Sequence, residues 1–161
     1  MRKYFTCLMC MILLSIAAPG HSCFSPKNGA GWTYEELVTG AEVIVLAEAI
    51  EATRDSDIVL YAFRVVEVLK GEIVEPIEFD AIGDGVGTTS FSDHSDKRFW
   101  ATHIGRSEFP CCICGPNHGF EIGKSYLLFP DSFGAMKSAE LIESTDDDWL
   151  KYVRKAVADG T

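Results

Sequence analysis

Two neighbouring segments rich in β-branched residues constrain the fold more than any other feature of this chain. Residues 42–52 (EVIVLAEAIEA) and 57–71 (DIVLYAFRVVEVLKG) alternate loosely between apolar and polar side chains, and the polar sequence RDSD marks a turn between them. Alternation with a period of two is typical of strands, and a short polar connection is typical of a hairpin. In the second segment both faces carry apolar side chains, which favours a barrel over an open sheet.

Weaker signals complete a mainly β fold with a helix at each end. Further strands are expected at 75–83 (EPIEFDAIG), 125–129 (SYLLF) and 138–144 (SAELIES). Thr33 and Glu36 have the spacing of a capping box, and Gly40 provides a helix stop. A last helix is expected after Ser144 or Thr145, with three aspartates in its first turn and an apolar stripe. Six apolar strand positions are expected to be largely buried: Val43, Val45, Val65, Phe79, Leu127 and Phe129.

The first 22 residues have the features of a secretory signal peptide. Arg2 and Lys3 precede an apolar stretch that ends in small residues. Cleavage after Ser22 is favoured over cleavage after Gly20, and it makes Cys23 the first residue of the mature chain. A lipoprotein signal fits poorly, because glycine and histidine stand where an aliphatic and a small residue are expected. Residues 23–161 are therefore predicted to form one exported domain, periplasmic or extracellular, without a transmembrane segment.

The predicted mature domain is strongly acidic. The whole chain has a formal charge of −10, and the signal peptide holds two of its 14 basic residues and none of its 24 acidic ones, so the mature charge is −12. Such a surface repels phosphate backbones, which argues against nucleic acid as a partner.

Four cysteines remain after removal of the signal peptide: Cys23, Cys111, Cys112 and Cys114. An even number of cysteines in an exported protein is typical of disulfides. Three of them lie in a long irregular segment, about 83–118, and a loop of that length in a compact domain is usually functional or held by cross-links. We expect these cysteines to tie the N-terminus and this loop to the rest of the domain.

A metal or redox centre is the alternative for this loop. Cys112, Cys114 and His118 could bind zinc with His94 or His103, although Cys-x-Cys is a tighter spacing than structural zinc sites use. The first and last cysteines of the cluster, Cys111 and Cys114, have the Cys-x-x-Cys spacing of a redox pair. The Gly-Pro-Asn sequence that follows them does not begin a helix, which would stabilise a thiolate.

The sequence contains no established catalytic fingerprint. His94 lies between Asp93 and Asp96, which resembles a catalytic dyad or a cation site, but acidic residues in such a loop usually form turns. No catalytic residue, cofactor or metal ligand is assigned from the sequence, and a non-enzymatic protein is expected.

The order of these features resembles the netrin-like module, and in particular bacterial relatives of the tissue inhibitors of metalloproteinases. The matching motifs are residues 41–48, residues 68–71, and the Cys-Gly at 114–115 followed by FEIGKSYLL at 120–128. The resemblance implies an OB-type five-stranded barrel with a short N-terminal and a C-terminal helix. It also implies a protein partner, a metalloprotease, whose zinc is chelated by the amine and carbonyl of Cys23 in a ridge with Phe24 and Ser25. Inhibitors of this family begin Cys-x-Cys, and this chain lacks the second cysteine of that start.

The disulfide pairing remains open between two arrangements. The resemblance favours Cys23 with Cys114. Local geometry favours Cys23 with Cys112 and Cys111 with Cys114, because a bridge between adjacent cysteines is strained. In both arrangements Cys23 pairs with the cluster, and a closed loop of about 90 residues is worth roughly 4–5 kcal/mol of stability.

Overall fold

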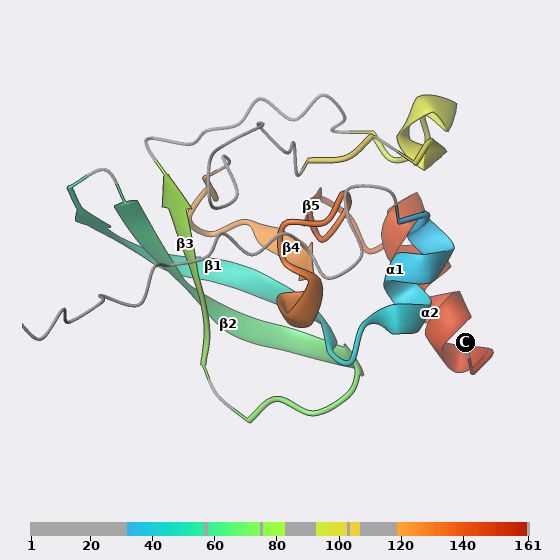
Figure 1. The fold of residues 1–161 in the computed structure, drawn as a ribbon, viewed down its shortest axis with the longest axis horizontal. Coiled ribbons are helices and arrows are strands. Elements are labelled where there is room, and N and C mark those ends of the chain that lie inside the picture. Colours follow the sequence, from blue (N-terminus) through green and yellow to red (C-terminus); the bar gives the residue numbers. More distant parts are fainter. Residues whose placement is uncertain are drawn as a thin grey trace, which may run out of the picture.

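The structure is a computed structural model that describes residues 32–56, 58–74, 76–82, 93–102, 104–106 and 119–160. Five antiparallel strands form one sheet in the order β3-β2-β1-β4-β5, and two helices lie at one end of it (Figure 1). The strands are β1 (Ile44–Asp55), β2 (Ile58–Lys70), β3 (Ile77–Ile82), β4 (Ser125–Leu128) and β5 (Ala139–Ile142). The helices are α1 (Tyr34–Gly40) and α2 (Asp148–Ala158), with short 3-10 turns η2 (Lys97–Trp100) and η3 (Pro130–Ser132). The mainly β prediction is confirmed, and every expected strand and helix is present.

The β1–β2 hairpin is the longest feature of the sheet. Its pairing runs from Asp55 opposite Ile58 to Ile44 opposite Lys70, with three irregularities in register. At its far end Gly71 has a φ of 74°, and a Cβ there would lie 2.2 Å from the carbonyl oxygen of Glu42. Only glycine fits this close approach, which explains why the strand ends there.

Two hydrophobic cores lie on opposite faces of the sheet. The helix-side core packs α1, α2 and Phe99 of η2 against Ile44, Leu46 and Leu127. The sheet core lies on the other face and contains residues of all five strands. Since β1 and β4 contribute to both cores, these central strands are apolar on both faces.

The sheet curls around its own core. Phe79 of β3, an edge strand, stacks on Phe133 of the β4–β5 connection with ring centroids 3.6 Å apart and planes at 5°. These two residues come from opposite halves of the sheet order, so their contact requires strong curvature.

Strand β2 differs from the sequence prediction. One of its faces packs in the sheet core, but the other remains in solvent, with Val66 57% and Val68 47% exposed. In the sequence, the apolar side chains on both faces of this strand indicate a barrel. Both faces are buried in β1 and β4, but the expectation of burial on both faces was wrong for β2. Of the six positions expected to be buried, Val45, Leu127 and Phe129 are fully buried, whereas the other three are partly buried: Val43, Val65 and Phe79.

The helix starts follow local hydrogen bonding. In α1 the predicted capping box is present, with Glu36 N–H donating to Thr33 Oγ1 at 3.2 Å and Thr33 N–H donating to Glu36 at 2.8 Å. In α2 the cap is Asp147, rather than the expected Ser144 or Thr145, because the Ser144 hydroxyl instead accepts from Asp146 N–H within the preceding turn. Among the described ranges, no helix has the length and apolar character needed to cross a membrane.

Candidate functional site

Most residues singled out from the sequence fall outside the described ranges. These are the proposed ridge and the cysteine cluster with its nearby histidines: Cys23, Phe24, Ser25, His103, Cys111, Cys112, Cys114 and His118. The predictions for them stay predictions. His94 is described, and it lies at the centre of a buried group of charged side chains.

Asp93 and Asp96 have the turn-forming role that the sequence suggested. Asp93 Oδ1 accepts from Ser95 N–H at 2.9 Å, and Asp96 Oδ1 accepts from Arg98 N–H at 2.9 Å to cap η2. Both carboxylates therefore shape the backbone around His94 and do not contact its ring.

His94 is held between two carboxylates in the interior. Its Nδ1 lies 2.7 Å from Asp147 Oδ2, and its Nε2 lies 3.6 Å from Glu140 Oε2, a distance that is too long for a hydrogen bond but close enough for an ion pair. Burial by itself lowers the pKa of His94, but the hydrogen bond to Asp147 and the nearby Glu140 charge outweigh it and raise the pKa to about 9. The ring is therefore an imidazolium at neutral pH.

Glu140 joins the strand β5 to the segment that carries His94. Its Oε1 accepts from Arg106 N–H at 2.6 Å, and its side chain is fully buried. Next to this bond lies Gly105, where a Cβ would be 2.7 Å from Lys137 N and 3.0 Å from Glu140 Oε1. The close approach of segment 104–106 to β5 thus depends on glycine at this position.

Lys137 holds the same segment from a second point. Its ammonium donates to the carbonyl oxygen of Ala101 at 2.7 Å and also to that of Ile104. It lies 5.0 Å from the centre of the Phe99 ring. Burial lowers the pKa of Lys137 to about 8, although the Glu140 carboxylate acts in the opposite direction.

Arg106 forms the other end of this group. Its guanidinium donates to the carbonyl oxygens of Ala139 and Gly119 and lies between 4.7 and 4.8 Å from the ring centres of Tyr126 and Phe120. Burial lowers the pKa of this guanidinium, and the charges of Tyr126 and Glu140 oppose that change. Arg106 thereby links the segment to the sheet core.

We call the five residues just described the buried charge cluster: His94, Arg106, Lys137, Glu140 and Asp147. Asp147 is half-buried and the other four residues are buried, with His94, Lys137 and Glu140 at most 2% exposed. Most of its polar atoms contact backbone groups or one another, as buried charges require in a folded interior. Within the described ranges, His94 Nε2, Glu140 Oε2 and Arg106 Nε are buried without a hydrogen bond. The cluster fastens residues 93–102 and 104–106 to β5 and to the start of α2.

Sequence reasoning missed this cluster because its members are distant along the chain. The His94 segment looked like a turn, and Glu140 sits in a short strand whose signal was weak. The position of Glu140 between the apolar residues Ala139 and Leu141 was a signal of a buried carboxylate, but nothing in the sequence indicated that His94 would be its partner. In the part of the chain that the structure covers, no group of three or more histidine, cysteine, aspartate or glutamate side chains is placed so that it could hold a metal ion.

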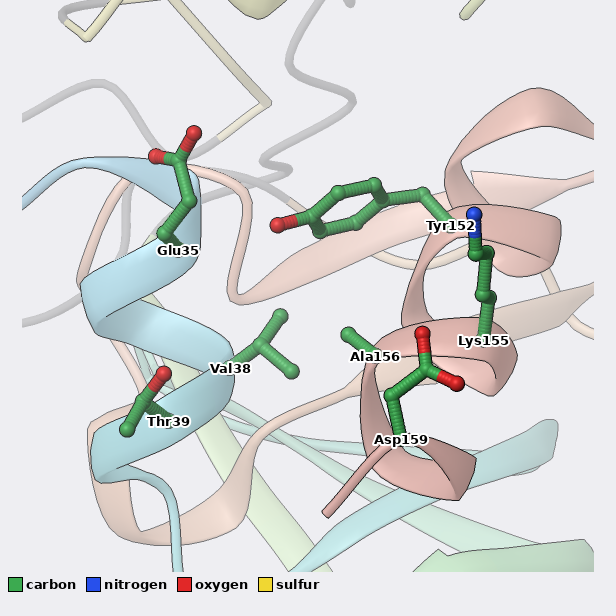
Figure 2. A pocket seen from close by; sticks show the side chains of 7 residues that line it. All are labelled: Glu35, Val38, Thr39, Tyr152, Lys155, Ala156 and Asp159. Atoms are coloured by element: carbon green, nitrogen blue, oxygen red, sulfur yellow. The ribbon is translucent and has the colours of Figure 1, made fainter. Parts of the chain in front are cut away.

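A surface hollow of about 320 Å³ lies between α1 and α2 (Figure 2). The Tyr152 ring reaches from α2 toward α1, and Val38 and Ala156 approach each other below it. Glu35, on α1, and Lys155, on α2, stand at its rim, so charges of both signs surround it. Such a mixed rim does not favour one class of ligand.

Comparison of the sequence with models of known protein families and with curated proteins finds no match.

Proposed function

We propose that this chain is an exported, non-enzymatic binding module that acts on a protein partner through its mature N-terminus. The observation that carries the proposal is that the side chains of the buried charge cluster bind other parts of the fold. The histidine, carboxylates and cations that the fold gathers are committed to fastening residues 93–102 and 104–106, so they support structure rather than chemistry. The element order, a short helix, five strands and a final helix, also agrees with the netrin-like resemblance.

The finer proposal for the fold is an OB-type barrel. Three features support it: the strand order with β3 and β5 at the edges, the sheet core drawn from all five strands, and the Phe79–Phe133 stack. Closure requires the β3 and β5 edges to approach each other, and OB barrels are often partly open at such a junction.

A metalloprotease is the partner class that the resemblance implies. The free α-amine and the carbonyl of Cys23 would chelate the catalytic zinc of the protease, with Phe24 and Ser25 beside it. A single disulfide from Cys23 to one cysteine of the cluster, Cys112 or Cys114, would hold this ridge in place.

The test begins with the intact mass of the exported protein, which should correspond to a chain that starts at Cys23 without added lipid. The mature protein should then inhibit a zinc metalloprotease, and a matched variant with one alanine added before Cys23 should not. Equal inhibition by the two forms would reject the zinc-chelating ridge.

The alternative, a metal-dependent or thiol-redox protein using the cluster with His118, has a distinct signature. Metal analysis and thiol titration of the purified mature protein should give neither bound metal nor free Cys23. A stoichiometric metal, or a Cys23 peptide recovered as a free thiol after digestion without reduction, would favour that alternative.

A further inference from the structure

A second hollow, which we call the β3 groove, lies where β3 begins. It has a volume of about 360 Å³ and is bounded by the β2–β3 connection, β3, the residue before β1 and η3. Figure 1 shows that connection as a green loop that extends away from the sheet. The residues that line the groove lie between Val43 and Asp131 in the sequence.

The floor of the groove is apolar and fixed in position. Ile73 and Phe79 line it, and both pack against the sheet core, where Phe79 also stacks on Phe133. Val74 stands beside them with 90% of its surface exposed, the largest exposed fraction among the large apolar residues of the described ranges. One exposed valine is ordinary, but an exposed valine at the mouth of an apolar hollow adds to a continuous surface that a ligand could cover.

The rim of the groove is acidic. Glu72, Glu78 and Asp131 line it, and no lysine or arginine of the described ranges does. Asp131 uses Oδ2 to accept from Val43 N–H at 2.9 Å, and within those ranges Glu72 and Glu78 form no ion pair. Three carboxylates around an apolar floor create a negative potential that attracts a cationic group and repels an anionic one.

From this complementarity we propose that the β3 groove binds a segment of a protein partner in which an apolar side chain is flanked by lysine or arginine. The apolar side chain contacts Ile73, Val74 and Phe79, and the flanking cations pair with Glu72 and Glu78. The volume is at the lower limit of ligand sites, which run from about 300 to 1,000 Å³, so it suits one inserted side chain rather than a large cofactor. A second copy of the mature chain is disfavoured as the occupant, because its formal charge of −12 would meet the same carboxylates.

The probe for this proposal is a short fluorescein-labelled peptide, Gly-Ser-Lys-Leu-Lys-Ser-Gly, titrated with the mature protein and followed by anisotropy. We expect saturable binding that weakens as salt rises from about 0.05 to about 0.3 M, because exposed ion pairs are screened. Peptides with glutamate in place of both lysines, or serine in place of leucine, should bind at least about tenfold more weakly.

Variants of the protein locate the site. Glu72→Lys with Glu78→Lys should weaken binding by about tenfold or more, whereas Glu51→Lys with Glu121→Lys makes the same change of net charge at exposed positions outside the groove and should leave binding unchanged. Both double variants should have the thermal unfolding midpoint of the wild-type protein. A change in peptide binding can then not be attributed to a loss of folding.

Equal loss in both double variants, or no saturable binding of the lysine peptide, would overturn the proposal. The outcome is independent of the proposed function, since the form with an alanine before Cys23 should bind the peptide as the mature protein does. Failure of the mature protein to inhibit the protease, with peptide binding retained, would therefore reject only the Cys23 ridge.

Discussion

Gly105→Ala is the sharpest test of the buried charge cluster. The added Cβ would lie 2.7 Å from the backbone nitrogen of Lys137 and 3.0 Å from Glu140 Oε1. A backbone atom cannot turn aside as a flexible side chain can, so segment 104–106 must move away from β5. Overpacking of this kind costs about 1–3 kcal/mol, and lengthening the 2.6 Å hydrogen bond from Arg106 to Glu140 adds a further cost of about 1.5–3 kcal/mol. The expected decrease in the free energy of unfolding is about 2.5–6 kcal/mol.

The measurement is urea unfolding followed by tryptophan fluorescence, because Trp100 and Trp149 pack against each other and against Phe99 in the helix-side core and report its loss. Gly40→Ala is the matched control, since its Cβ would meet only the Trp32 ring at 3.7 Å, an ordinary contact. We expect that control to lie within about 1 kcal/mol of the wild-type protein. A Gly105→Ala variant within about 0.5 kcal/mol of wild type would refute the tight approach of this segment to β5.

Two further predictions concern titration and packing. The pKa of His94 is raised from 6.5 to about 9, so its stabilising contribution is complete below pH 6.5 and is lost as pH rises toward 9. Linkage gives a loss of about 2 kcal/mol between pH 6 and 8, which the onset of Lys137 deprotonation near its pKa of about 8 offsets in part. Urea unfolding over that range should show this decline in the wild-type protein and not in His94→Gln, and equal slopes would contradict it. Phe129→Ala removes a fully buried ring and should cost about 3–5 kcal/mol, whereas Val66→Ala, at a position 57% exposed, should cost under about 0.5 kcal/mol; similar urea midpoints for the two variants would contradict the strand assignment.

The secondary structure could be predicted closely because its signals are local. The capping box of Thr33 and Glu36, the glycine that ends the hairpin and the alternation along β1 and β2 each depend on neighbours in the chain. The start of α2 was less certain, since several consecutive residues could cap it. Asp147 was selected because its second carboxylate oxygen also reaches His94, a contact between residues 53 positions apart.

The sequence by itself determined a mainly β chain with a hairpin, three shorter strands and two flanking helices, together with the acidic charge. The tertiary structure decided which faces of those strands are buried, because apolar side chains on β1 and β2 look alike in sequence and only the placement of the helices distinguishes them. It also decided the role of His94. From the sequence alone, a histidine between aspartates in a loop could be catalytic, bind a cation or simply lie in a turn. The fold brings Glu140 to one of the His94 ring nitrogens and Asp147 to the other, and because this group is buried it stabilises the structure.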